Sequence, residues 1–329
     1  MTDRVVLGVD GGGTKTDVCV ATDAGRVLAF VSGAGSNWEG VGLDAVGATL
    51  RELIAAVLAD AGISIGQVDA ASFCLAGIDW PSDEARLGPV IEHLGLACPW
   101  MVDNDSFAAL RAGSERGVGC VSIAGTGGVA AGRNAHGEVA RTMGIAIGEG
   151  SGAWGLVAEA LAAMARARNR GGAPTDLTDR LLRATNCDDV SALFEGLSRG
   201  TVHVGGALSV HVIDAARDGD AVAQTISRSC GAEHGRDVVG VATRLGLTGD
   251  VDVVLAGGVH TSGEAHFRAG FVEEVDARFP NAHLRVLDAP PVAGAVLLAL
   301  DQVGAVLPGI HEAVCVETGA ARSAGAKQG

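Results

Sequence analysis

A turn of three glycines follows an aspartate near the start of the chain. The stretch 9–16 reads VDGGGTKT and comes directly after the apolar run 5–9. Glycines let successive backbone N–H groups converge on a phosphate, Thr14 adds a hydroxyl, and Asp10 can hold Mg2+ directly or through water. The spacing fits neither a Walker loop nor a dinucleotide fingerprint. The pattern therefore indicates either a phosphate-binding turn or a tight hairpin after a buried strand.

Two further glycine-rich stretches lie in the second half of the chain. Residues 123–128 read IAGTGG and offer another set of backbone donors with one hydroxyl. Alone this stretch fits a plain hairpin better than a phosphate site, whereas as the counterpart of the first turn it could bind a polyphosphate. Residues 255–259 read LAGGV between a predicted strand and a helix, where a flat backbone can lie against a base or ribose. A plain strand-to-helix turn explains that spacing equally well.

Polar side chains also follow a predicted strand at 100–102. The stretch 102–106 reads VDNDS and leads into a helix. The carboxyl end of a strand in an α/β sheet is the usual position for ligands. Asp105 could therefore act as a general base, and it could equally cap the helix that begins at Ser106.

The elements that position these residues alternate between strands and helices. β-Branched and alternating runs predict strands at 5–9, 14–21, 27–31, 70–76, 100–102, 119–123, 129–132 and 251–255. Apolar residues at three- and four-residue steps predict helices at 43–59, 83–94, 106–112, 153–168, 221–245 and 293–300. Strand, glycine turn and strand occur in the same order in both halves. We therefore predict an α/β protein with two duplicated domains.

The predicted domains are 1–115 and 116–317. The stretch 318–329 has no apolar periodicity, and we expect it to be a disordered tail. With 329 residues, of which 48% are hydrophobic, the chain can form a core in each domain.

Charge and cysteine content limit the partners. The formal net charge is -15, and the only lysines are Lys15 and Lys327, so we expect no nucleic-acid partner. The first apolar run is too short for a signal sequence, and no run approaches the roughly 18 residues of a membrane span, which predicts a cytoplasmic protein without a membrane partner. The seven cysteines have no zinc spacing, and we expect them to be reduced. Cys120 is the one that could bind an iron–sulfur cluster together with its copy in a partner subunit.

These motifs resemble the acetate and sugar kinase, Hsc70 and actin superfamily, and within it the BadF/BadG/BcrA/BcrD family that includes N-acetylglucosamine kinases. The resemblance spans residues 4–305. It is carried by the stretches 10–16, 35–37, 104–105, 125–127, 149–152, 256–259 and 291–294. It implies two ribonuclease-H-like domains with an interdomain cleft, the actin-like ATPase fold.

The resemblance also implies an ATP-dependent sugar kinase that uses ATP and Mg2+ and forms a homodimer. Asp105 would be the catalytic base on a sugar 6-hydroxyl, and Asp10 would bind the metal. The implied cofactor-binding residues are Gly11, Gly12, Gly13, Thr14 and Lys15 in the first turn, Gly125, Thr126 and Gly127 in the second, and Gly257, Gly258 and Val259 at the adenosine. The implied substrate-binding residues are Ser36, Asn37, Asn104, Asp105, Glu149, Gly150 and Ser151.

One stretch departs from the amino sugar kinases of that family. They usually read GGWG, two residues, then LGDEGS, whereas residues 141–151 read RTMGIAIGEGS. The missing tryptophan and aspartate normally shape sugar recognition. We expect N-acetylglucosamine to be converted to its 6-phosphate with relaxed specificity, and glucosamine or N-acetylmuramic acid are the nearest alternatives.

Two other functions are compatible with the resemblance. An ATPase that activates 2-hydroxyacyl-CoA dehydratases would need two suitably placed cysteines per chain, and apart from Cys120 none stands out. A sugar-sensing regulator without catalytic activity would need a DNA-binding segment, and no helix-turn-helix pattern precedes Val5.

Overall fold

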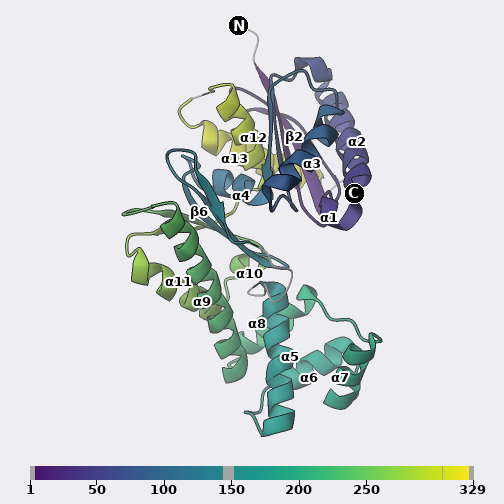
Figure 1. The fold of residues 1–329 in the computed structure, drawn as a ribbon, viewed down its shortest axis with the longest axis vertical. Helices are drawn as coiled ribbons and strands as arrows, with labels where there is room; N and C mark the ends of the chain where they lie inside the picture. The colour runs from purple at the N-terminus through teal and green to yellow at the C-terminus, as the bar shows by residue number, and fades with distance from the viewer. Residues whose placement is uncertain (1–3, 144–151, 306, 326–329) are drawn as a thin grey trace. The chain divides into compact units, whose positions relative to one another are not determined.

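The computed structural model describes residues 4–143, 152–305 and 307–325. They form two compact units: residues up to 118 together with those from 287 onward, and residues 119–286 (Figure 1). The sequence-based division differs, because it assigns 287–317 to the second domain. These residues lie in the first unit, where helix α12 (Val292–Gln302) packs its apolar side chains on the sheet.

The first unit is built on a five-stranded sheet with the order β3-β2-β1-β4-β5. Its strands are β1 (Val5–Gly11), β2 (Lys15–Thr22), β3 (Val27–Ala34), β4 (Ala70–Leu75) and β5 (Trp100–Asn104). β1 pairs with β2 antiparallel and with β4 parallel, and β5 runs parallel to β4. The carboxyl ends of β1, β4 and β5 therefore meet at one edge, where the predicted site residues occur.

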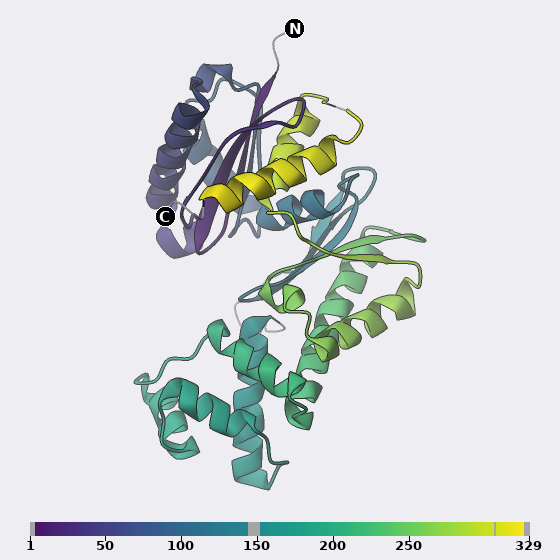
Figure 2. The ribbon, with the colours of Figure 1, turned by 180° about the vertical axis from the view of Figure 1, so that it is seen from behind.

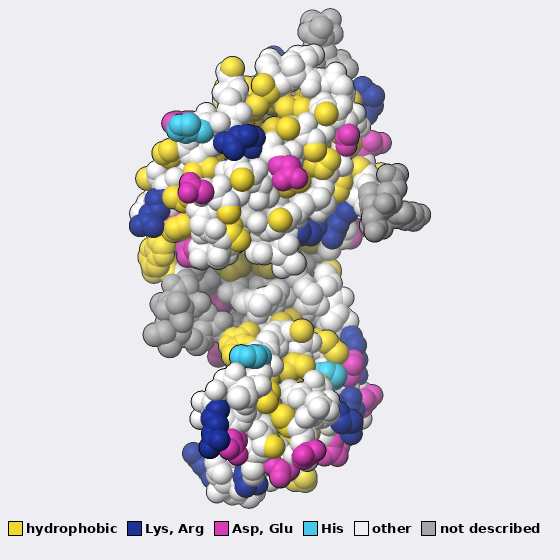
Figure 3. Space-filling view, turned by 90° about the vertical axis from the view of Figure 1, so that its right-hand side faces the viewer, with side chains coloured by type: hydrophobic (Ala, Val, Ile, Leu, Met, Phe, Trp, Pro, Cys, Tyr) yellow, Lys and Arg dark blue, Asp and Glu magenta, His cyan; other side chains and the backbone are white. Residues whose placement is uncertain are grey.

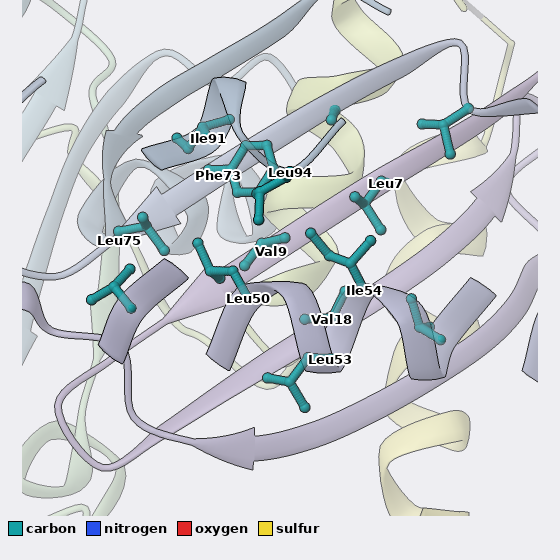
Figure 4. Close-up of a cluster of buried hydrophobic side chains, with 14 of the residues drawn as sticks. Leu7, Val9, Val18, Leu50, Leu53, Ile54, Phe73, Leu75, Ile91 and Leu94 are labelled. Atoms are coloured by element: carbon teal, nitrogen blue, oxygen red, sulfur yellow. The ribbon is translucent and has the colours of Figure 1, made fainter. Parts of the chain in front are cut away.

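Helices cover both faces of this sheet. They are α1 (Trp38–Val41), α2 (Leu43–Ala61), α3 (Pro81–Glu92), α4 (Asp105–Gly113), α12 and α13 (Ile310–Gly325). On one face α2 and α3 bury Leu50, Ile54 and Ile91 against Val9 and Phe73 (Figure 4). The other face packs against α12, α13 and α4. The three- and four-residue apolar spacing of α2 is what directs one stripe of that helix into the core.

The C-terminal segment corrects one prediction. Residues 318–325 are part of α13 and not of a disordered tail, and α13 crosses the strands of the first unit (Figure 2). Val314 and Thr318 are fully buried, and Thr318 Oγ1 donates to Val314 O at 2.7 Å. The prediction was wrong because the apolar side chains that anchor this helix, Ile310 and Val314, precede residue 318, and the residues after it are mostly small. Ala313 also approaches the turn at Gly25.

The second unit repeats the topology of the first. Its strands are β6 (Gly119–Ala124), β7 (Gly128–Arg133), β8 (Val139–Arg141), β9 (Asp252–Ala256) and β10 (His283–Val286). Their order is β10-β9-β6-β7-β8, with β6 antiparallel to β7 and parallel to β9. β6 thus occupies the place of β1, and β9 that of β4. The predicted duplication is confirmed.

Seven α-helices are described in the second unit (Figure 1). They are α5 (Ala153–Arg170), α6 (Leu177–Thr185), α7 (Val190–Arg199), α8 (Ser209–Arg217), α9 (Ala221–Arg244), α10 (Gly258–Thr261) and α11 (Ala265–Arg278). α9 and α11 pack closely, because Gly231 has no side chain where a Cβ would lie 1.9 Å from Phe267 O. α5 to α8 share a core that includes Leu156, Leu181 and Leu193.

Charged side chains are scattered over the described surface in Figure 3, where arginine and acidic residues alternate without a large patch of either sign. Among the residues that the structure describes, no helix combines the length and the apolar character needed to cross a bilayer.

Candidate active site

Carboxylates gather at the edge where β1, β4 and β5 end. In the register of the sheet, Asp10 lies opposite Cys74, and Cys74 lies opposite Asp103. Paired residues of neighbouring strands point to the same face. Because Cys74 packs against Ala108 and Ala295, this face is the one covered by α4 and α12. Asp10 and Asp103 therefore project toward the same helices.

Electrostatics at this edge favour a bound cation. Burial, and next the negative charges of Asp105 and Asp17, raise the pKa of Asp10 to about 8, although Lys15 acts in the opposite direction. A carboxylate in such surroundings either takes up a proton or binds a cation. Mg2+ commonly uses one or two carboxylates and completes its shell with water and substrate phosphates. The chemistry of Asp10 fits that mode, and no cluster of three or more metal-binding side chains occurs in the described chain.

The first glycine turn is a hairpin between β1 and β2. Gly12 N donates to Lys15 O at 2.9 Å, so this N–H is already used within the turn. Gly13 and Thr14 are exposed at the tip. Lys15 pairs with the buried carboxylate of Asp17. The two interpretations of the sequence are therefore compatible, because a hairpin can still present its exposed tip to a phosphate.

The stretch 35–37 supports this turn. Ser36 N donates to Gly12 O at 3.0 Å, and the buried Ser36 Oγ accepts from Thr16 Oγ1 at 2.9 Å. A Cβ at residue 35 would lie 2.3 Å from the carbonyl oxygen of residue 13, so only glycine fits there. Asn37 follows, and its Oδ1 caps α1 by accepting from Glu39 N at 3.0 Å. Residues 35–37 and the turn are thus brought together, as the expected sugar and phosphate contacts require.

Asn104, and not Asp105, caps helix α4. Asn104 Oδ1 accepts from Ser106 N at 3.0 Å, and its Nδ2 donates to Ile78 O at 3.1 Å. Asp105 is the first residue of the helix and is partly exposed. The capping alternative for Asp105 is therefore wrong. The buried Asn104 instead fixes the start of α4 against the loop after β4, and so holds the backbone of Asp105 in place.

Three backbone segments converge at the second glycine turn. Ala153 N donates to Gly125 O at 2.9 Å, and Trp154 N donates to Thr126 O at 3.0 Å. At Gly257 the backbone has φ +89°, and a Cβ would lie 2.4 Å from Ala124 O. Gly125 to Gly127 are therefore contacted by the start of α5 on one side and by the turn before α10 on the other.

The predicted nucleotide residues of the second unit differ in exposure. Thr126, Gly127 and Gly258 are exposed, whereas Val259 is buried. Glu149, Gly150 and Ser151 lie outside the described residues.

Cys120 is fully buried in β6, and burial raises the pKa of its thiol to about 12. A buried protonated thiol is a poor ligand for a cluster shared with another subunit.

Sequence reasoning missed two groups of residues. Asp17 lies opposite Asp10 in the sheet, and Asp103 lies two strands from Asp10 on the same face; the alternation of β2 and β5 could have indicated this shared face. Ser122, His234 and His260 form a buried polar cluster in the second unit. These three residues are far apart in the sequence, since Ser122 and His234 are separated by 112 positions. No local motif could therefore predict the cluster.

The model of the BadF/BadG/BcrA/BcrD ATPase family matches residues 7–299. The chain belongs to this family. The resemblance inferred from the motifs is confirmed, and the match includes all three glycine turns and the start of α4.

Curated relatives cover almost the whole chain. An N-acetylmuramic acid/N-acetylglucosamine kinase of Clostridium acetobutylicum is 26% identical over 303 residues, which are 90% of this chain and 98% of the relative. An N-acetyl-D-glucosamine kinase of Dictyostelium discoideum is 27% identical over 320 residues, which are 92% of this chain and 99% of the relative.

A solved structure from Chromobacterium violaceum, described as a candidate N-acetylglucosamine kinase, superposes with a TM-score of 0.69 at 21% identity. The superposition covers 91% of this chain and all of the other. At 21% identity this similarity concerns the fold alone. Together with the repeated sheet topology it confirms the predicted α/β, actin-like ATPase fold.

Proposed function

We propose that this family member is an ATP-dependent sugar kinase that transfers the γ-phosphoryl group of ATP to the 6-hydroxyl of N-acetylglucosamine. The observation that carries the proposal is the meeting of Asp10 and Asp105 at the edge of the first sheet, beside an exposed glycine turn. The two curated relatives, which are named as kinases of amino sugars, support the same substrate class.

Asp105 is the proposed general base. It would accept the proton of the sugar 6-hydroxyl while that oxygen forms a bond to the γ-phosphorus. The bond between the γ-phosphorus and the bridging oxygen breaks, and ADP leaves with the electron pair. Asn104 supports this role by fixing the start of α4 through Ser106 N and Ile78 O. Positioning of this kind supplies much of the rate in phosphoryl transfer.

Asp10 is the proposed metal ligand. Mg2+ held there would neutralise negative charge on the phosphates. The two hairpins, 11–15 and 125–127, are proposed to bind phosphate oxygens through the backbone N–H groups of their exposed tips, since the N–H groups of Gly12 and Gly125 bond within the turns. Residues 257–259 are proposed to contact the adenosine. Exposure of Gly13, Thr126 and Gly258 supports these assignments, because a binding backbone must be accessible.

Sugar binding is proposed for residues 36–37 and 104–105, and also for 149–151. Asn37 lies next to the loop after β4, where a Cβ at Gly77 would approach Asn37 Oδ1 to 2.6 Å. Trp38 Nε1 donates to Gly77 O at 2.6 Å and holds the same loop. The loop also receives Asn104, so the two proposed sugar-binding stretches are anchored to one segment.

A coupled ADP-release screen over hexoses, amino sugars and their N-acetyl forms tests the proposal. We expect N-acetylglucosamine to give the highest kcat/KM, with the phosphate on O6 by phosphorus–proton correlation NMR. A preference for glucose or glucosamine by more than about tenfold, equal to about 1.4 kcal/mol in transition-state binding, would contradict the N-acetyl assignment. Absence of sugar-dependent ADP release would contradict the kinase assignment itself.

A further inference from the structure

A buried polar cluster lies directly behind the proposed nucleotide turns of the second unit. Ser122 Oγ in β6 is 3.0 Å from Nδ1 of His234 in α9 and 2.9 Å from Nε2 of His260 in α10. Ser122 and His234 have no exposed surface, and 6% of His260 is exposed. One hydroxyl therefore joins a strand and two helices inside the protein.

The single hydroxyl proton of Ser122 limits how this residue can bond to the two rings. A serine hydroxyl carries one proton, so it can donate to only one of the two rings and must accept from the other. Burial, and next the neighbouring His234, lower the pKa of His260 to about 3, so this ring is neutral at physiological pH. Whichever ring accepts the serine proton, both hydrogen bonds form only while Ser122 Oγ stays at hydrogen-bonding distance from both rings.

Aromatic packing further fixes the ring of His260. Its centroid lies 5.2 Å from that of Phe267 and 5.2 Å from that of Phe271, both in edge-on contacts at 83° and 87°. Both phenylalanines are buried in α11. The imidazole is thus held by packing as well as by Ser122, which limits movement of the short helix α10.

The cluster connects two of the proposed binding segments. Ser122 lies three residues before Gly125 in the chain, and His260 directly follows Val259. The two segments also touch through their backbones, because a Cβ at Gly257 would lie 2.7 Å from Gly125 N. A displacement of α10 would therefore move the turn 257–259 relative to the turn 125–127.

We propose that Ser122, His234 and His260 are positioning residues that set the relative placement of the two nucleotide-binding turns of the second unit. This inference rests on the proposed function. Buried apolar contacts would tolerate small shifts between β6, α9 and α10, whereas a satisfied buried hydrogen-bond network favours one geometry. The network acts through the backbone of residues 125–127 and 257–259 and does not itself touch the nucleotide.

Paired substitutions separate positioning from simple stability. Ser122→Ala removes the shared hydroxyl, and Ser227→Ala is the matched control, because Ser227 Oγ is buried in α9 without a hydrogen-bond partner among the described residues. His260→Leu removes the ring nitrogen, whereas the amide of His260→Gln can occupy the position of Nε2. His234→Asn similarly retains a polar atom near Nδ1.

Calorimetric titration of ADP and steady-state kinetics provide the readouts. We expect Ser122→Ala and His260→Leu to raise the dissociation constant of ADP and the KM for ATP about three- to tenfold, the effect of losing one hydrogen bond. The KM for the sugar should not change. Ser227→Ala should match the wild type, and His260→Gln and His234→Asn should recover most of the ADP affinity.

Two results would overturn the inference. If Ser122→Ala and His260→Leu melt at lower temperature but bind ADP as the wild type does, the cluster only stabilises the fold. If His260→Leu does not fold, the pair Ser122→Ala and His260→Gln gives the same comparison. Failure of the wild type to bind ADP would instead contradict the proposed function, and the inference with it.

Discussion

The two glycine hairpins have the same place in the duplicated topology but different surroundings. In the first unit the next-to-last residue of β1 is Asp10, and Asp17 and Asp105 contribute further negative charge. In the second unit the next-to-last residue of β6 is Ile123, and the turn is contacted by the backbones of the start of α5 and of Gly257. The backbone turn is common to both units, whereas a carboxylate occupies the next-to-last position of the preceding strand in the first unit and an apolar side chain occupies it in the second.

This difference suggests a division of work. Carboxylates can accept a proton or bind a cation, which the chemical step requires. Backbone groups held in place by a buried network can bind a nucleotide without taking part in the chemistry. On the proposed function, the first unit supplies Asp10 and Asp105 to the chemistry. The second unit supplies the turns that hold ATP. The predictions below test whether these two roles can be separated.

The largest effect is expected for Asp105→Asn. Loss of a positioned base should lower kcat at least about 100-fold, while the dissociation constant of ADP stays within about twofold. Asp44→Asn is the matched control, because it also removes a carboxylate from the first turn of a helix in the same unit. If Asp105→Asn retains most of its turnover in steady-state assays, the base lies elsewhere.

A smaller effect is expected at the turn before α10, where neighbouring glycines have different roles. Gly257→Ala introduces a methyl group 2.4 Å from Ala124 O at a positive φ, and should destabilise the protein by about 1–3 kcal/mol. Gly258→Ala meets nothing within 4 Å. It should keep the melting temperature of the wild type and weaken ADP binding about tenfold, or 1.4 kcal/mol, because the methyl group would occupy the nucleotide surface.

Equal ADP affinity in Gly258→Ala and the wild type would contradict the proposal that residues 257–259 contact the nucleotide. Denaturant unfolding measured on both glycine variants provides the stability control.

The smallest effect concerns Asp10 and pH. The pKa of Asp10 is raised from 3.8 to about 8, so the folded protein binds this proton more tightly than the unfolded chain does. The contribution of this group to stability is therefore fully present below pH 3.8 and is lost as pH rises toward 8. Asp10→Asn has no such loss. Its melting temperature in chelator should therefore rise relative to that of the wild type as the pH increases from acidic to alkaline values.

Differential scanning fluorimetry of the two proteins at several pH values tests this expectation. If the melting temperatures of the two proteins change with pH in parallel, the pKa of Asp10 is not raised by folding. Adding Mg2+ with ADP should reverse the order of the two melting temperatures at alkaline pH, because only the wild type retains the carboxylate ligand.

The sequence predicted the elements that carry strong local patterns. The β-branched run before Asp10 became β1, and the apolar stripe of residues 43–59 became most of α2. The two glycine hairpins were also found at their predicted places, because a turn that needs glycine leaves a local signal. The duplication followed from these same local signals.

Features that depend on distant contacts were not predicted. Helix α13 packs on the first unit through Ile310 and Val314, and the mostly small residues from 318 onward gave no periodicity that could extend the helix in the prediction. The return of residues 287–325 to the first unit likewise depends on contacts such as that between Gly8 and the backbone of Val296. The helix cap is Asn104 and not Asp105. The sequence could not distinguish them, because both residue types are good N-caps and only the local backbone geometry decides between them.

Hydrogen exchange measured by mass spectrometry tests the division between the two units most directly. ADP alone should slow exchange in peptides that cover 122–130 and 255–262, and N-acetylglucosamine alone should slow exchange in peptides that cover 34–42 and 103–110, because bound ligands suppress local opening of the segments they contact. The first result would place the nucleotide on the turns of the second unit, and the second would place the sugar near Asn37 and Asp105. An unchanged rate at 255–262 with ADP, or at both 34–42 and 103–110 with the sugar, would contradict the account.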